Sequence, residues 1–203
     1  MLLRRRPPGI ESHPYQHPAG LEHINPEWIA VLRWLSANRV EYVAIGPVAR
    51  AIRGDTEADG PVALVPAPYG RNLDRLAHAL NSAHARLRID GVGGEDTAAA
   101  ENTAVKLGAE KLSRGIRWRL RCGAYDVDVE GALARAEEAP AGAPDYQELL
   151  YEAGRFALEP GLNVQVASPE DIERFDHLYR TGVAPEIKIT RNTKLEHGSG
   201  QAQ

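Results

Sequence analysis

The sequence predicts a mixed α/β (α+β) fold, and three kinds of segment lead to this expectation. Apolar residues recur at helical spacing in several stretches, the first of them in residues 26–38. The short apolar run PVALVPA, residues 61–67, is typical of a strand buried on both faces. Between residues 116 and 130, apolar and charged residues alternate with period two, as they do in strands. A chain of 203 residues, 43% hydrophobic and 26% charged, is typical of one globular domain.

The predicted domain occupies residues 26–182 and lies between two segments without periodicity. Residues 1–25 are rich in Pro, His, Gly and Arg, so we expect a flexible N-terminal arm, and residues 183–203 should form a flexible C-terminal tail. No apolar run approaches the roughly 20 residues of a membrane span, and the first residues lack a signal-peptide core. The single cysteine, Cys122, excludes an internal disulfide and fits a reducing compartment. We therefore expect a cytoplasmic protein without membrane association or a disulfide-linked partner.

Helices and strands alternate in the first half of the predicted domain. Asn25 is a suitable N-cap for the first helix, Gly46 permits a sharp turn after the first strand, and Asn72 is a suitable cap for a later helix. The expected elements, in order, are a helix over 26–38, a strand over 40–45, a short helix over 47–53, a strand over 61–67 and a helix over 73–83. An acidic loop, residues 55–60, separates the short helix from the second strand.

The second half is expected to contain a strand hairpin between helical segments. In order, we expect a glycine-rich loop at 91–94, a helix over 97–112, the hairpin over 116–130, a short helix over 145–151, a strand over 161–166 and a helix over 169–179. Ser168 followed by Pro169 is a strong signal for the start of the last helix. The glycine-rich loop lacks a following strand-to-helix motif and is weak evidence for phosphate binding.

The hairpin can be paired residue by residue. Gly123-Ala124 suits a two-residue type II′ turn, from which the register follows by counting. The expected pairs are Cys122–Tyr125, Arg121–Asp126, Leu120–Val127, Arg119–Asp128, Trp118–Val129 and Arg117–Glu130. Each charged pair has opposite signs and the other pairs are apolar. A slip of one residue would set arginine opposite valine, so the pattern favours this single alignment.

Two interpretations of the hairpin carboxylates stay open. Three carboxylates within five residues would suggest a divalent-metal site, with Asp126 and Asp128 as candidate ligands. Three arginines on the facing strand can neutralise the same carboxylates. We favour a salt-bridged sheet face, and the metal site is the alternative.

The order of these segments resembles the minimal bacterial nucleotidyltransferases of the DNA-polymerase-beta-like superfamily. The resemblance covers roughly residues 27–180 and rests on VEYVAIGPVARAIRG, PVALVP, NLDRLAHAL, YDVDVEG and LNVQVASPEDIERF. It implies a mixed sheet with helices packed mainly on one face. In that family a strand ends in Gly-Gly or Gly-Ser, a second strand carries Asp-x-Asp, and a later strand carries a third Asp. These carboxylates bind two Mg²⁺ ions with the triphosphate and help to activate the attacking hydroxyl.

Residue by residue, the resemblance gives a mixed result. Gly46 matches the first glycine of the turn, and Pro47 stands where the second small residue is expected. Pro61 and Ala63 occupy the two positions of Asp-x-Asp, whereas Asp128 matches the third aspartate. Neither proline nor alanine ligates Mg²⁺ through its side chain. The resemblance therefore implies a nucleotidyltransferase scaffold without its two-metal site, which is the organisation of a pseudoenzyme.

The leading functional hypothesis is a protein that has lost two-metal catalysis and acts by binding a protein, an RNA or a nucleotide, without a cofactor. A net charge of -4 and a pI of about 6.0 argue against a strongly nucleic-acid-binding surface. Arginine is the residue that holds phosphate by paired hydrogen bonds. The candidate residues for nucleotide or phosphate binding are Gly46, Arg50, Arg117, Arg119 and Arg121.

Two other functions are considered. The alternative is an active transferase that moves a nucleotide from a nucleoside triphosphate to a hydroxyl, with Mg²⁺ and the triphosphate bound by displaced carboxylates. Its candidate catalytic residues are Asp59, which precedes Pro61 by two positions, and Asp128. A third possibility is a purely structural role, in which the apolar neighbourhood of residues 61–65 pairs with another chain.

Overall fold

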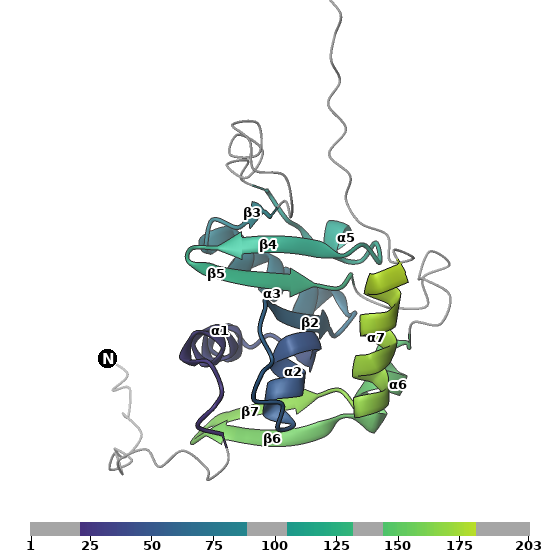
Figure 1. The fold of residues 1–203 in the computed structure, drawn as a ribbon. Helices are drawn as coiled ribbons and strands as arrows, with labels where there is room; N and C mark the ends of the chain where they lie inside the picture. The colour runs from purple at the N-terminus through teal and green to yellow at the C-terminus, as the bar shows by residue number, and fades with distance from the viewer. Residues whose placement is uncertain (1–20, 89–104, 132–143, 182–203) are drawn as a thin grey trace, which may run out of the picture.

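A computed structural model describes residues 21–88, 105–131 and 144–181 (Figure 1). Most of the expected arm and tail, the glycine-rich loop at 91–94 and the first part of the helix expected over 97–112 lie outside these residues. At the beginning of the described chain, Ile24 is already buried and Leu21 packs against the core. Of the described helices, none is both long enough and apolar enough to cross a membrane.

A seven-stranded mixed sheet forms the centre of the molecule, in the order β3-β4-β5-β2-β1-β7-β6. The strands are β1 Tyr42–Ile45, β2 Val62–Pro66, β3 Arg86–Leu87, β4 Trp118–Cys122, β5 Tyr125–Val129, β6 Gly154–Glu159 and β7 Leu162–Val166. β1 runs parallel to β7 and β2 runs parallel to β5, while the other neighbours are antiparallel. The mixed α/β class expected from the sequence is confirmed.

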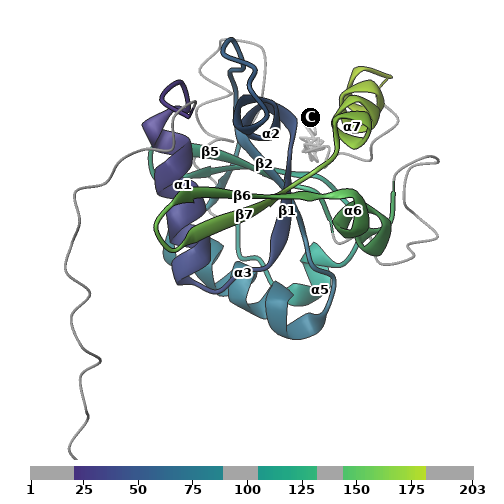
Figure 2. The same ribbon diagram turned by 90° about the horizontal axis from the view of Figure 1, so that it is seen from below.

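Helices cover both faces of this sheet. They are α1 Pro26–Ala37, α2 Gly46–Ile52, α3 Gly70–Ser82, α5 Ala109–Leu112, α6 Tyr146–Glu152 and α7 Pro169–Thr181. α2 and α7 lie on one face, and α3 and α5 lie on the opposite face (Figure 2). The cover is thus two-sided, not mainly on one face as expected. The composition of the central strands explains why helices lie on both faces. Every residue of β1 and β2 is buried, and apolar strands of this kind must be covered on both sides.

The start of α1 follows the sequence signal for a helix cap, whereas the start of α3 does not. Asn25 caps α1 as expected, since its side chain accepts a hydrogen bond from the backbone N–H of Glu27. Asn72 does not cap α3, which begins two residues earlier, at Gly70. The Asn72 side chain is buried and bonds to the backbone of Glu41 in both directions, and it donates to the carbonyl of Ala67. The amide serves tertiary packing instead of a helix end.

The helix expected over 97–112 does not run through all of its described residues. In its described part only Ala109–Leu112 is helical. The residues before it extend along the end of α3, where Val105 donates to the carbonyl of Ala85. Leu107 exchanges two backbone hydrogen bonds with the side chain of Asn81. These long-range bonds hold residues 105–107 outside a helix.

Both hairpins are well defined. In β4–β5 the register matches the predicted pairs from Cys122–Tyr125 to Trp118–Val129, and Gly123 has φ 63°, the sign that a type II′ turn requires. The β6–β7 hairpin brings in β6, a strand that the sequence did not indicate, and its register shifts between Ala157 and Glu159.

Candidate functional site

Three positions singled out by the resemblance lie side by side on one face of the sheet. β1 ends at Ile45, and Gly46 (φ 59°) turns the chain directly into α2. A β-carbon on Gly46 would lie 3.1 Å from the Cβ of Ala63, so glycine permits both the backbone conformation and this close approach. Ala63 is also in register with Asp128 on the neighbouring strand β5. Residues in register project to the same face, so Ala63 lies between the turn and the aspartate.

Apolar side chains stand at the positions next to Asp128 and the turn. Ala63 presents a methyl group and is buried. Pro47 opens α2, and a β-carbon on Gly60 would lie 3.0 Å from its Cγ, so the ring packs against the loop that leads into β2. Pro61 follows in that loop and provides neither a backbone N–H nor a polar side chain. Among these positions only Asp128 offers a carboxylate.

Asp128 is fully buried and is held by two arginines. The Nη2 atom of Arg117 donates to its Oδ2 atom at 2.6 Å. The Nη2 atom of Arg88 lies 3.1 Å from its Oδ1 atom, in an ion pair without hydrogen-bond geometry. Both guanidinium side chains are only 10% exposed. The negative charge of Asp128 is thereby compensated within the protein.

Arg117 connects the hairpin to α7. Its Nε atom lies 3.3 Å from the Oε1 atom of Glu130, and its guanidinium stacks over the Tyr179 ring at 3.6 Å. The Tyr179 hydroxyl donates to the Glu130 carboxylate. Burial lowers the pKa of Arg117, but Tyr179, Asp128 and Glu130 outweigh it and the net shift is upward. Burial and the nearby Glu130 raise the pKa of Tyr179 well above its ordinary value, so its hydroxyl stays protonated and donates.

The other predicted arginines are also engaged. Arg121 binds Asp126 at 2.9 Å across the hairpin, as the register requires. Arg119 stands opposite Asp128 in the predicted register. Arg50, on α2, pairs with Asp176 of α7 at 2.6 Å and lies 3.5 Å from Asp55. The salt-bridged face predicted for the hairpin is present, and its carboxylates are in ion pairs with arginine.

Arg88 also belongs to this cluster of charges, although no sequence pattern indicates it. It directly follows the two-residue strand β3, and its Nη1 atom lies 3.5 Å from Asp126 in addition to the contact with Asp128. The position of Arg88 depends on the pairing of β3 with β4, two strands that lie far apart in the sequence, and no local pattern predicts this pairing. Within residues 21–88, 105–131 and 144–181, no three His, Cys, Asp or Glu side chains lie close enough to hold a metal ion.

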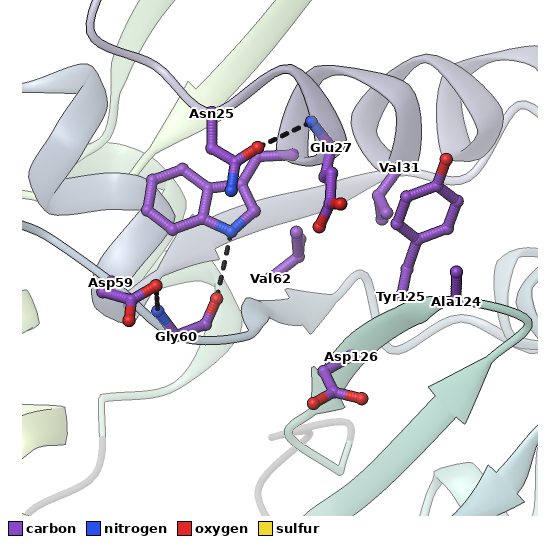
Figure 3. A pocket seen from close by; sticks show the side chains of 10 residues that line it. Asn25, Glu27, Val31, Asp59, Gly60, Val62, Ala124, Tyr125 and Asp126 are labelled. Carbon is purple, nitrogen blue, oxygen red and sulfur yellow. Dashed lines mark hydrogen bonds between the residues drawn. The ribbon is translucent and has the colours of Figure 1, made fainter.

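Asp59 lines a pocket of about 300 Å³ where β2 and β5 begin, next to α1 (Figure 3). Its carboxylate accepts a hydrogen bond from the backbone N–H of Gly60 at 2.8 Å, and the Gly60 carbonyl accepts one from the Trp28 indole at 3.0 Å. Asp126 lines the same pocket, whereas Asp128 does not. Of the two candidate residues of the active-transferase hypothesis, Asp59 therefore lines this pocket together with Asp126, and Asp128 does not line it.

We compared the chain with known proteins. No protein-family model matches the sequence, and no curated protein matches it. The resemblance to nucleotidyltransferases therefore rests on the order of the segments and on the site positions named above.

Proposed function

We propose that the chain is a nucleotidyltransferase-like protein without two-metal catalysis, and that it acts by binding. The adjacency of Gly46, Ala63 and Asp128 supports the first part of this proposal. The resemblance requires the turn after the first strand, the second strand and a later strand to meet at one point. Gly46, Ala63 and Asp128 meet in this way although they are far apart in the sequence.

The enclosure of Asp128 carries the proposal. A two-metal mechanism needs several carboxylates around a shared pair of ions, open to the triphosphate. Here the neighbouring position is the methyl group of Ala63, and Asp128 is fully buried between Arg117 and Arg88. A metal ion at Asp128 would have to displace two buried guanidiniums from their closest counter-charge and leave them the longer contacts with Glu130 and Asp126, which is costly.

The internal ion pairs also favour one class of ligand. Arg50, Arg117 and Arg121 each bind a carboxylate of the same chain. A phosphate group would have to compete with these carboxylates for every guanidinium. This pairing, with the net charge of -4, supports a protein partner over a nucleotide or an RNA.

Calorimetric titration tests the proposal. A non-hydrolysable nucleoside triphosphate and a short single-stranded RNA would be titrated into the protein, each with and without Mg²⁺. We expect no binding of the triphosphate that depends on Mg²⁺, because Asp128 is already paired with two arginines and Pro61 and Ala63 stand at the other two positions. The variant Pro61→Asp/Ala63→Asp is the matched comparison, since it restores both missing carboxylates next to Asp128.

Binding that strengthens about tenfold or more with Mg²⁺ in the unmodified protein would overturn the proposal. The active-transferase alternative would then be preferred, and Asp59→Asn and Asp126→Asn would show whether the pocket carboxylates hold the ion. Tight RNA binding that is independent of Mg²⁺ would leave the loss of catalysis intact and overturn the preference for a protein partner.

A further inference from the structure

The surface that lines the pocket beside α1 is largely polar, and its apolar part comes from aromatic and aliphatic side chains. Trp28 and Tyr125 line it together with Val31 and Val62, in a volume of about 300 Å³ (Figure 3). The indole of Trp28 is fixed by its hydrogen bond to the Gly60 carbonyl, so this wall is rigid. The volume is at the lower end of the range for small-molecule sites and suits a group of a few heavy atoms.

Three carboxylates also line this pocket. Glu27, Asp59 and Asp126 line the pocket, and Glu27 and Asp59 are exposed to solvent at its opening. Asp126 is paired with Arg121. No ion pair between described residues involves Glu27 or Asp59. Glu27 also lies in the first turn of α1, where the helix N-terminus stabilises a carboxylate.

The positions of these carboxylates favour an organic cation over a metal ion. No three of the described acidic, histidine or cysteine side chains lie close enough together to hold a metal ion, so these carboxylates do not converge on one point. A metal ion could therefore be ligated by at most two of the three. A planar or extended organic cation has several N–H donors and can reach carboxylates that stand apart. Aromatic rings attract such a cation by its charge and leave room for its alkyl part.

We propose that this pocket binds an organic cation, a guanidinium or alkylammonium group carried on an alkyl chain. The group enters between the walls formed by Trp28 and Tyr125, and its N–H groups donate to Glu27 and Asp59 at the opening. A free polyamine or a basic side chain of a partner protein would supply the same chemistry. This inference does not depend on the loss of catalysis proposed above, because it uses other residues.

Calorimetry with agmatine tests the inference, since agmatine has a guanidinium and an ammonium at opposite ends of a short alkyl chain. A short peptide with one central arginine represents the protein source, and the same peptide with the uncharged citrulline is its control. We expect agmatine and the arginine peptide to bind and the citrulline peptide not to bind. The tighter of the two cations identifies the source.

Matched variants locate the binding. Glu27→Gln/Asp59→Asn should weaken binding of the cations by about tenfold, because it removes both unpaired charges without changing side-chain shape. Glu57→Gln/Glu152→Gln removes the same net charge from exposed positions outside the pocket and should leave binding unchanged. Equal binding of the arginine and citrulline peptides, or equal weakening in the two variants, would overturn the proposal.

Discussion

Asp128 shows how a single buried carboxylate organises the charged face of the hairpin. Its replacement by asparagine takes the closest counter-charge from the buried guanidiniums of Arg117 and Arg88, which keep the longer contacts with Glu130 and Asp126. We expect Asp128→Asn to lower the free energy of unfolding by about 3–5 kcal/mol. Urea denaturation followed by circular dichroism measures this change.

The neighbouring pair provides the control for this prediction. Asp126 binds Arg121 and has a longer contact of 3.5 Å with Arg88, but the Asp126 and Arg121 side chains are 32% and 50% exposed, so solvent screens the charge of Asp126. Asp126→Asn should therefore cost less than about 1 kcal/mol. Equal losses for the two substitutions would contradict the assignment of Asp128 as the buried anchor of the cluster.

Cys122 illustrates how burial suppresses chemical reactivity. The thiol is buried at the end of β4, and burial, with a smaller effect of Asp126, raises its pKa to about 12. Because the thiolate is the reactive form, the native protein should react very slowly with a thiol reagent at pH 8. The reaction should become fast in denaturant. Rapid stoichiometric labelling of the native protein would show that Cys122 is accessible.

At the scale of elements, Asn72 joins α3 to the ends of β1 and β2. Alanine has the higher helix propensity, so a helix considered alone predicts that Asn72→Ala is stabilising. The structure predicts the opposite, because the substitution removes the hydrogen-bond partner of the Glu41 backbone N–H and of the buried Ala67 carbonyl. We expect a loss of about 2–3 kcal/mol in urea denaturation. Asn163→Ala, at an exposed position of β7, should change stability little, and a similar loss there would contradict the argument.

At the scale of the whole molecule, buried neutral acids predict a loss of stability at alkaline pH. Burial raises the pKa of Cys122 and Tyr146 to about 12 and raises those of Tyr42 and Tyr179 as well. In the unfolded chain these groups ionise near their ordinary pKa values of 9.0 for the thiol and 10.0 for the phenols. Above those values the unfolded state binds fewer protons than the native state, so raising the pH favours unfolding.

The free energy of unfolding should thus be constant up to about pH 9 and then fall. Each group ionised only in the unfolded state contributes about 1.4 kcal/mol per pH unit. Urea midpoints at pH 8, 9, 10 and 11 measure the slope. Cys122→Ala should remove the earliest part of the fall, between about pH 9 and 10, and an unchanged slope in this variant would contradict the assignment.

Sequence patterns predicted those parts of the fold that depend on residues close together in the sequence. The β4–β5 register is an example, since a slip of one residue would have placed Arg121 or Arg119 opposite an apolar residue. Asn72 shows the opposite case. A polar residue directly before the apolar residues of a helix has the local pattern of an N-cap, and this pattern does not reveal tertiary hydrogen bonds. Its partners Glu41 and Ala67 come from other elements. The strand β6 was missed since it lies at the sheet edge and begins with glycine.

The same contrast holds for the candidate site. The positions Gly46, Ala63 and Asp128 could be inferred from the sequence, because each follows from the place of a strand in the chain order. The role of Arg88, and the pairing of Arg50 with Asp176, depend on how separate segments pack. The pocket that joins α1 to the start of β5 has the same origin, so the sequence alone could not indicate it.

The irregular β6 strand has a consequence for how the molecule behaves at high concentration. An open sheet edge is a template on which another chain can add a strand, and long flat edges promote aggregation. One edge of this sheet is the two-residue strand β3, and the other is β6, whose pairing with β7 is interrupted between Ala157 and Glu159. A bulge of this kind increases local twist and breaks the row of available hydrogen-bonding groups. Both edges are thereby poor templates for growth, which protects the central apolar strands from edge-to-edge assembly.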